Sequence, residues 1–339
     1  MLYTQDVVNF LSKLSVKKVL NAFGIFASYY ISHLTRKPIL WGKPITISIE
    51  PTTNCNLGCP ECPSGLKAFT RPTGNIEATN YKKLLDEINS TTVYCYFYFQ
   101  GEPFMHPKFL ELVQYATQRN LYTVTSTNAH FLTKRKALET VQSGLNRIII
   151  SIDGTTQEVY EKYRIAGDLN KVIQGTKNLV EAKRELKSNT PHIIIQFLVV
   201  RHNEHQIEDV KQLGKELGVD EVKFKTAQIY DYENGNPLIP KNEQYARYKK
   251  TESGKYLIKN KLENRCWKLW HSAEITWDGK VVPCCFDKDA KYEMGNVFTD
   301  SFSTIWNNKS YTSFRSRLLQ GRKEIDICTN CSEGLKVWE

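Results

Sequence analysis

The stretch PTTNCNLGCPECP, residues 51–63, says most about the fold and chemistry of this chain. Its three cysteines, Cys55, Cys59 and Cys62, have the spacing C-x3-C-x2-C. Iron–sulfur clusters are held by cysteine thiolates, and a closed four-iron cluster takes four of them. Three thiolates on one loop leave one iron without a protein ligand, which predicts a site for chemistry rather than for electron storage alone. Zinc also favours clustered cysteines, so the spacing by itself leaves a zinc site open.

The sequence around this loop alternates between strand-like and helix-like segments. Strands are expected at residues 45–50, 93–100, 122–126, 147–153, 192–200 and 222–227. Helices are expected at residues 81–88, 107–119, 133–143, 157–164, 170–186 and 204–217. Repeated β-then-α units predict an α/β fold with a parallel sheet and right-handed crossovers. The pattern leaves open whether this sheet lies flat or closes as a partial barrel.

Short polar motifs stand at the ends of the second, third and fourth expected strands. They are Gln100-Gly-Glu-Pro103, Ser126-Thr-Asn-Ala129 and Ser151-Ile-Asp-Gly154. With the cysteine loop, they resemble the motifs of the radical S-adenosylmethionine (SAM) superfamily. The resemblance implies a partial (β/α)6 TIM-type barrel and a [4Fe-4S] cluster on Cys55, Cys59 and Cys62. It also implies reductive cleavage of SAM to a 5′-deoxyadenosyl radical that abstracts a substrate hydrogen.

The same resemblance implies roles for residues around SAM. Glu102 matches the acceptor for the SAM amine, although Gln100 replaces the first glycine of that motif. Arg164 matches an arginine that pairs with the SAM carboxylate, a geometry that a guanidinium suits. Glu61 stands before the last cysteine, where the family usually carries an aromatic residue. The expected SAM contacts are Gln100, Gly101, Glu102, Ser126, Asn128, Ser151, Asp153 and Arg164.

Side chains inside the expected barrel are the candidates for catalysis. Strand alternation puts Tyr98 on the same face as Gln100 and Glu102, and this face would point into the cavity. The candidate catalytic residues are Tyr98, Gln196, Lys223 and Lys225. A buried lysine is costly unless it is paired, so the two lysines either face SAM or substrate or extend to the surface.

A second cysteine group lies near the C-terminus and comprises Cys266, Cys284, Cys285, Cys328 and Cys331. Residues 277–279, Trp-Asp-Gly, predict a hairpin turn just before Cys284. The group resembles the SPASM/twitch extension of radical SAM enzymes, which binds auxiliary [4Fe-4S] clusters. The resemblance implies one closed cluster on Cys266, Cys284, Cys328 and Cys331, with Cys285 spare or in place of Cys284. A structural zinc site is the alternative, and Cys95 is interpreted as a buried small hydrophobe.

The bulk properties bear on partners and location. The chain has 339 residues and a formal net charge of +10, which favours anionic partners or indicates a solvated basic surface. Clustered cysteines without a secretory signal predict a cytoplasmic protein. Residues 19–34 are apolar with basic flanks but too short for a span, which predicts a helix packed on the body or in peripheral contact with a membrane. No basic stripe interleaved with aromatic residues predicts nucleic-acid binding.

Three parts are expected: a helical N-terminal extension (1–43), a radical SAM partial barrel (44–233) and a small Cys-rich iron–sulfur domain (234–339). An auxiliary cluster that accepts or relays an electron indicates oxidation of an alcohol, sugar or glycan-type small molecule. This class is favoured because peptide maturases often carry an N-terminal leader-binding domain. A maturase of a ribosomally made peptide is the alternative, and a non-catalytic iron–sulfur or zinc-binding protein is the second alternative. The resemblance also implies a reductant such as flavodoxin or ferredoxin.

Overall fold

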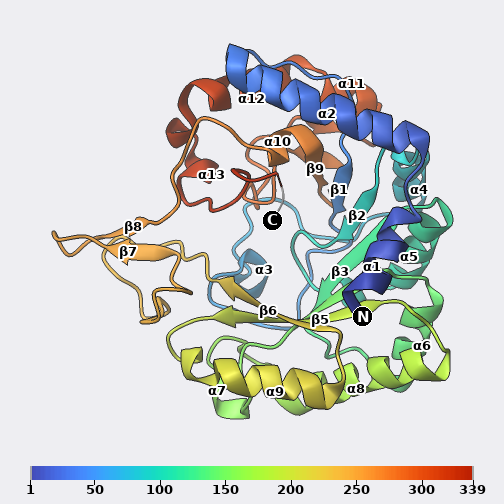
Figure 1. Cartoon of the computed structure of the whole chain (residues 1–339), viewed down its shortest axis with the longest axis vertical. Helices are drawn as coiled ribbons and strands as arrows, with labels where there is room; N and C mark the ends of the chain where they lie inside the picture. The colour runs from blue at the N-terminus through green and yellow to red at the C-terminus, as the bar shows by residue number, and fades with distance from the viewer. Residues whose placement is uncertain (1, 338–339) are drawn as a thin grey trace.

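The computed structural model describes residues 2–337. Six parallel strands form a curved sheet whose outer side is covered by helices (Figure 1). The strands are β1 (Thr46–Ile49), β2 (Tyr94–Phe97), β3 (Tyr122–Thr127), β4 (Arg147–Ser151), β5 (His192–Val199) and β6 (Glu221–Thr226). The helices among them are α3 (Pro63–Leu66), α4 (Ala78–Ile88), α5 (Phe109–Gln118), α6 (Lys134–Gln142), α7 (Gln157–Glu161), α8 (Leu169–Glu185) and α9 (Ile207–Leu217), with 3-10 turns η1 (Pro103–Met105) and η2 (Glu204–Gln206). The predicted α/β partial barrel is confirmed.

Side chains of these strands alternate between the core and the inner face of the sheet. Ile47 pairs with Cys95 in register, and both side chains are fully buried beneath the helices. Phe97 lies in the same core, where burying one such side chain contributes about 1.5–3 kcal/mol. Tyr94 and Tyr96 alternate with them and are only half-buried. The inner face of the sheet therefore carries aromatic and polar side chains that are not packed into the helix-covered core.

The sheet continues past β1 into the C-terminal part of the chain. Strand β9 (Ser272–Ile275) pairs in parallel with β1, with Thr46 opposite Ser272. A hairpin then adds the antiparallel strand β10 (Lys280–Val282), followed by β11 (Gly295–Asn296). The hairpin predicted around residues 277–279 is confirmed, and Gly279 takes the positive φ of 87° that its turn requires.

Most of the other C-terminal elements pack around this extension, and one two-stranded hairpin projects away from the body (Figure 1). These elements are β7 (Tyr248–Lys250), β8 (Tyr256–Ile258), α10 (Lys268–His271), α11 (Phe302–Trp306), α12 (Lys309–Gly321), η3 (Arg322–Glu324) and α13 (Asp326–Thr329). Trp270 and Trp306 are fully buried in the same hydrophobic cluster as Ile47 of the barrel. The barrel and most of the cysteine-rich region therefore share one core.

Two N-terminal helices, α1 (Leu2–Leu11) and α2 (Val16–Thr35), lie against the body. Residues after α2 accept hydrogen bonds from the body, since the indole of Trp270 donates to the Ile39 carbonyl at 3.0 Å. At α1, Asp6 binds both Tyr122 and Arg147, which belong to the first residues of β3 and β4. Helix α1 therefore covers the end of the barrel opposite to the strand ends that carry the motifs. No helix in residues 2–337 is long and apolar enough to cross a membrane.

Candidate active site

The cysteine loop leaves the end of β1 and returns into the short helix α3. Cys62 is the N-cap of α3, and its carbonyl accepts a hydrogen bond from Leu66 N at 2.9 Å. Cys59 is buried, whereas Cys55 and Cys62 are half-buried. Burial raises the pKa of Cys55 to about 12, so the bare loop carries a thiol there and binding of iron must displace its proton.

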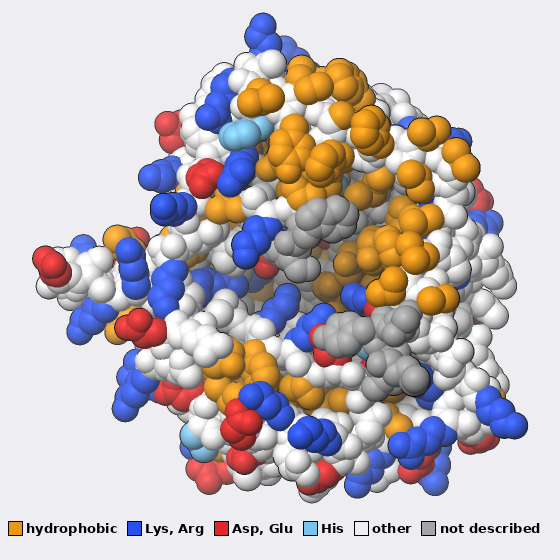
Figure 2. Space-filling view, in the orientation of Figure 1, with side chains coloured by type: hydrophobic (Ala, Val, Ile, Leu, Met, Phe, Trp, Pro, Cys, Tyr) orange, Lys and Arg blue, Asp and Glu red, His pale blue; other side chains and the backbone are white. Residues whose placement is uncertain are grey.

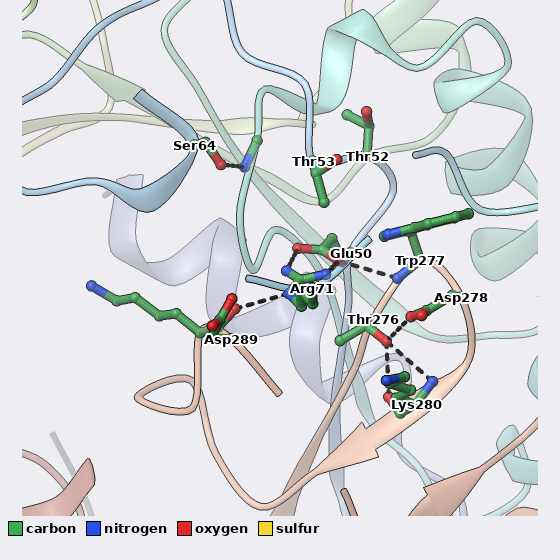
Figure 3. Close-up of polar contacts among 12 residues, drawn as sticks. Glu50, Thr52, Thr53, Ser64, Arg71, Thr276, Trp277, Asp278, Lys280 and Asp289 are labelled. Carbon is green, nitrogen blue, oxygen red and sulfur yellow. Dashed lines mark hydrogen bonds and ion pairs between the residues drawn. The ribbon is translucent and has the colours of Figure 1, made fainter. Parts of the chain in front are cut away.

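The motif after β2 packs directly onto this loop. Gly101 has a φ of 75°, and a Cβ there would lie 2.2 Å from the carbonyl oxygen of Thr52. Only glycine fits both this conformation and this approach. The Gly101 amide donates to the Ser64 hydroxyl at 2.8 Å (Figure 3). Beside it, the Oε1 of Gln100 is buried and has no hydrogen-bond partner among the described residues, which fits a site that awaits a polar ligand.

Glu102 lies at the centre of a polar cluster that joins the ends of β2 and β3. Its carboxylate accepts hydrogen bonds from the Thr127 hydroxyl and the Asn128 amide, both at 2.7 Å. Burial raises the pKa of Glu102 to about 7, although these bonds act in the opposite direction. Asn128 also donates to Asn56 of the cysteine loop at 2.8 Å. Thr127 and Asn56 were not named among the expected contacts, although Thr127 belongs to the motif at residues 126–129 and Asn56 to the cysteine loop, and these motifs are the signals that could have found them.

Asp153 and Arg164 form an ion pair at 2.5 Å, in which the Asp153 side chain is almost fully buried. The remaining Asp153 oxygen accepts from Leu198 N at 2.7 Å. Arg164 also points at the cysteine loop, with Nη1 3.7 Å from the Cys59 sulfur. The resemblance implied that Arg164 pairs with the SAM carboxylate, and the structure adds that this cation lies beside the Cys59 sulfur.

Other predicted residues occupy less enclosed positions. Ser151 lies opposite Gln196 in the β4–β5 register, so these two side chains share the inner face of the sheet. Ser126 and Gln196 are half-buried, and Ser151 is buried. Lys223 and Lys225 are exposed, and Lys223 binds Glu221 at 3.2 Å. Lys223 lies opposite Gln196 in the β5–β6 register, so both lysines stand on the inner face of the sheet, and their role toward SAM or substrate stays a prediction.

Glu61, the residue unlike the family pattern, has a local partner. Its Oε2 accepts a hydrogen bond from Tyr230 N at 2.9 Å. Tyr230 in turn accepts from Lys288 Nζ at 2.8 Å. Glu61 thus connects the cysteine loop to the segment after β6 and to the auxiliary region.

The auxiliary cysteines come together from three distant segments. One enclosed cavity is lined by Cys266, Cys284, Cys328 and Cys331. Cys285 does not line it and instead lies 3.6 Å from the ammonium of Lys268. The four cysteines that line the cavity are the four ligands that the resemblance implied. Cys284 is among them, whereas its neighbour Cys285 is not.

A buried arginine accompanies these four sulfurs. Arg322 is fully buried, and its Nη2 lies 3.3 Å from the Cys331 sulfur. Its guanidinium also donates to the carbonyl oxygens of Arg265 and Glu333, each at 2.8 Å. A fixed cation here would stabilise the negative charge of cluster and thiolates. No sequence signal marks Arg322, because it lies outside every cysteine motif.

The spacing within both cysteine sets bears on the choice between iron–sulfur cluster and zinc. Among residues 2–337, no three His, Cys, Asp or Glu side chains come close enough to share one metal ion. A single zinc ion requires such crowding, because all its ligands lie within about 2.3 Å of it. A four-iron cluster does not, because each thiolate binds a different iron. Both sets therefore suit a cluster better than zinc.

A buried salt bridge holds the two cysteine regions together (Figure 3). Arg71, which follows the cysteine loop, binds both oxygens of Glu50 at 2.6 and 2.9 Å. The same carboxylate accepts from Trp277 N of the auxiliary hairpin at 3.2 Å. Thr70 N donates to Asp289 at 2.8 Å beside this pair. The segments that carry Cys62 and Cys284 are thus fixed to one another.

Glu274 is a further inner-face residue that the sequence analysis missed. It lies on β9 opposite Ser48 of β1, and Ser48 donates to the Tyr98 carbonyl at 2.7 Å. The Glu274 side chain is buried, and its Oε2 has no hydrogen-bond partner among the described residues. Burial raises its pKa, while nearby Lys268 and Ser48 act against this shift. An unpartnered carboxylate oxygen costs free energy, so it is a candidate to contact a ligand.

Comparison with known families decides what this arrangement is. Residues 49–217 match the radical SAM superfamily, and residues 266–332 match the SPASM iron–sulfur cluster-binding domain. The chain belongs to the radical SAM superfamily. As a radical SAM enzyme it uses SAM and a [4Fe-4S] cluster, and its SPASM domain binds auxiliary iron–sulfur.

Two curated relatives extend over most of this radical SAM enzyme. The tungsten-containing aldehyde ferredoxin oxidoreductase cofactor-modifying protein of Pyrococcus furiosus is 27% identical over 314 residues, covering 84% of this chain and 86% of that protein. The PqqA peptide cyclase of Bradyrhizobium diazoefficiens is 26% identical over 298 residues, covering 81% and 76%. Both are similar along the barrel and the auxiliary region together.

Solved structures share the fold. SuiB of Streptococcus suis bound to S-adenosylmethionine superposes with a TM-score of 0.63 at 15% identity, covering 82% of this chain and 69% of that one. BtrN in complex with AdoMet and 2-DOIA gives 0.52 at 20% identity, covering 86% and 94%. At these identities the likeness supports the partial barrel with its C-terminal extension and leaves the substrate open.

Proposed function

We propose that this radical SAM enzyme is a maturase that oxidises or cross-links a peptide. The observation that carries the proposal is the similarity, over about four-fifths of the chain, to a protein named as a peptide cyclase. The relatives favour this alternative over the alcohol, sugar or glycan-type substrate expected from the sequence. Family membership likewise argues against a non-catalytic protein.

The SAM side of the reaction is assigned to residues around the cysteine loop. We assign the iron ligands to Cys55, Cys59 and Cys62, and the SAM amine to Glu102. The unpartnered Oε1 of Gln100 beside the loop supports a polar ligand in the same place. When bound, the reduced cluster and SAM supply a 5′-deoxyadenosyl radical that removes a hydrogen atom from the substrate.

The auxiliary side is assigned to the pocket of Cys266, Cys284, Cys328 and Cys331. The pairing of β9 with β1 supports two neighbouring cluster sites. It joins the auxiliary region to β1, and β1 ends at the cysteine loop. A substrate on the inner face of the sheet would then lie between the cysteine loop and the auxiliary pocket. The expected reductant, a flavodoxin or ferredoxin type of protein, belongs to the proposal as well.

We assign Glu274 as the base that accepts a proton from the substrate. Two-electron oxidation of a carbon centre removes a hydrogen atom, a proton and an electron. The hydrogen atom would go to the 5′-deoxyadenosyl radical and the electron to the auxiliary cluster, so a base on the inner face of the sheet must take the proton. The free Oε2 of Glu274 is suited to accept that proton, since its raised pKa makes its carboxylate more basic than an exposed glutamate. Tyr98 is half-buried beside it, and its carbonyl accepts a hydrogen bond from Ser48, the residue opposite Glu274.

Mass spectrometry tests the substrate class. The enzyme is expressed without oxygen together with short peptides encoded beside its gene, and the peptides are weighed. We expect a loss of two hydrogen atoms from one peptide, and deuterium placed at the modified carbon should appear in 5′-deoxyadenosine. Turnover of a small alcohol or sugar, with all peptides unchanged, would contradict the peptide proposal and favour a small-molecule substrate.

The Glu274→Gln variant tests the proton acceptor separately. Product formation should fall by about 10²–10⁴-fold, because the amide cannot take up the proton. Cleavage of SAM in the absence of substrate should stay unchanged, since Glu274 has no part in it. Glu293→Gln, at a partly exposed glutamate of the same region, is the matched control and should retain full turnover. Normal product formation by the Glu274→Gln variant would refute this role.

A further inference from the structure

The outer face of α1 and α2 carries an unusual number of exposed apolar side chains. Among the described residues, 17 large hydrophobic side chains are exposed, and 11 of these lie between Val7 and Trp41. On α2 they follow a helical stripe that includes Val16, Leu20, Phe23 and Leu34, with Leu34 80% exposed. Figure 2 shows this apolar surface as a band over α2 and α1. We call it the α1–α2 face.

The inward side of the same helices already has its partners. Ile25 and Tyr29 of α2 are buried in the main core, and Tyr29 packs against Trp270 at 5.8 Å between ring centroids. Phe10 of α1 stacks on Tyr94 at 5.1 Å. The exposed stripe is therefore a second apolar side. Phe26 at its edge also packs against Trp267 at 6.1 Å between ring centroids, whereas Leu20, Phe23 and Leu34 are mostly exposed.

Charge around the face is one-sided. Residues 7–49 contain six lysines and arginines and no aspartate or glutamate. Lys17 and Lys37 are exposed at opposite ends of α2. Lys18 is buried and donates to the Asn120 carbonyl at 2.6 Å, so it serves the fold. Glu263 and Glu324 lie near Arg36 beyond the end of the stripe, which leaves the centre of the face without acidic groups.

We propose that the α1–α2 face binds the surface of an anionic lipid bilayer. Apolar side chains in one stripe with basic residues at its ends match a helix that lies in the plane of the lipid headgroups. Tyr30 and Trp41, both exposed on this face, are residue types enriched at that depth. The proposal is independent of the reaction and of its substrate.

A second copy of the chain fits this face less well. A two-fold dimer would bring the same surface of both copies together. Lys17 and Lys37 would then meet an equally basic face, with no acidic residue in 7–49 to pair with them. Anionic lipid supplies the missing charge as well as an apolar phase.

The geometry allows binding and catalysis at once. Helix α1 contacts the first residues of β2, β3 and β4, through Tyr94, Tyr122 and Arg147. The cysteine loop follows the last residue of β1, at the opposite end of the barrel. A bilayer under the α1–α2 face would therefore leave the cysteine loop open to water and to a reductant.

Vesicle sedimentation with the full-length holoenzyme tests the proposal. We expect binding to vesicles of phosphatidylcholine mixed with phosphatidylglycerol, weaker binding to pure phosphatidylcholine, and weakening by salt. The double variant Phe23→Glu, Leu34→Glu should bind at least about tenfold less. Lys17→Gln, Lys37→Gln should lose only the preference for the anionic vesicles. Leu257→Glu, at an exposed apolar residue on β8 away from this face, should bind as the parent does.

Two results would overturn the proposal. One is a parent protein that fails to bind anionic vesicles, or whose binding the Phe23→Glu, Leu34→Glu variant retains. The other is a parent dimer in solution that this variant converts to a monomer, because the face would then join two copies. Cleavage of SAM by each variant is measured in parallel and should be unchanged, which shows that the variants are folded.

Discussion

The cysteine loop and the auxiliary pocket hold sulfur ligands in opposite ways. Cys55, Cys59 and Cys62 lie within eight residues on one loop, and polar atoms such as Gln100 Oε1 beside them lack partners. The auxiliary cysteines come from three segments of residues 266–331 and line an enclosed cavity with Arg322. The difference teaches that an open reactive site is built locally, whereas a closed site depends on the whole fold.

The largest expected effect separates Cys284 from Cys285. Cys284→Ala should lose the auxiliary cluster, because Cys284 lines the cavity and Cys285 does not. Product formation should stop, while cleavage of SAM in the absence of substrate continues. Iron analysis and the product assay measure both effects.

Cys285→Ala is the matched control for that variant. It should keep its iron content, because Cys285 is not among the residues that line the cavity and its sulfur accepts a hydrogen bond from Lys268 at 3.6 Å. The reverse outcome, with the cluster lost in Cys285→Ala and kept in Cys284→Ala, would mean that the two neighbours exchange roles.

A smaller effect is expected where the two regions meet. Arg71→Met leaves the buried Glu50 carboxylate without its cation, since the side chains are 3% and 0% exposed. We expect the free energy of unfolding to fall by about 3–5 kcal/mol, measured by denaturant unfolding of the metal-free protein. The double variant Glu50→Gln, Arg71→Met should recover part of this loss. A single variant as stable as the parent would show that the pair does not fix the regions together.

The smallest effect concerns pH at the open site. The pKa of Glu102 is about 7, above its usual value, so the carboxylate ionises only as the pH rises through 7. In the role we propose for Glu102, the ionised carboxylate binds the SAM amine, so affinity for SAM should fall by about tenfold per pH unit below that pKa. Calorimetric titration of the reconstituted enzyme between pH 6 and 8 measures the slope.

Glu102→Gln is the control for this titration. It should bind SAM more weakly and lose the part of the pH dependence that Glu102 causes. The same raised pKa should make the SAM-free fold less stable as the pH rises from about 4.5 to about 7, since the charged form is disfavoured by burial. An unchanged pH slope in the variant would contradict the role of Glu102.

The sequence predicted the local parts of the molecule well. The strands, the hairpin at Gly279 and the motif at Glu102 all depend on neighbours close in the chain. Pairing of β9 with β1 joins residues more than 200 positions apart, so no local sequence pattern predicts it. Glu274 becomes an inner-face residue only through that pairing. Arg322 approaches the auxiliary sulfurs only after folding, because it lies outside every cysteine motif of the sequence.

Iron content of the triple variant Cys55→Ala, Cys59→Ala, Cys62→Ala tests the central claim most directly. Two independent [4Fe-4S] sites predict about eight irons per chain in the parent and about four in the variant. The variant should keep the brown colour of the auxiliary cluster and form no 5′-deoxyadenosine with any reductant. A variant without iron, or one that still cleaves SAM, would contradict an open site on the loop and a separate closed site in the C-terminal region.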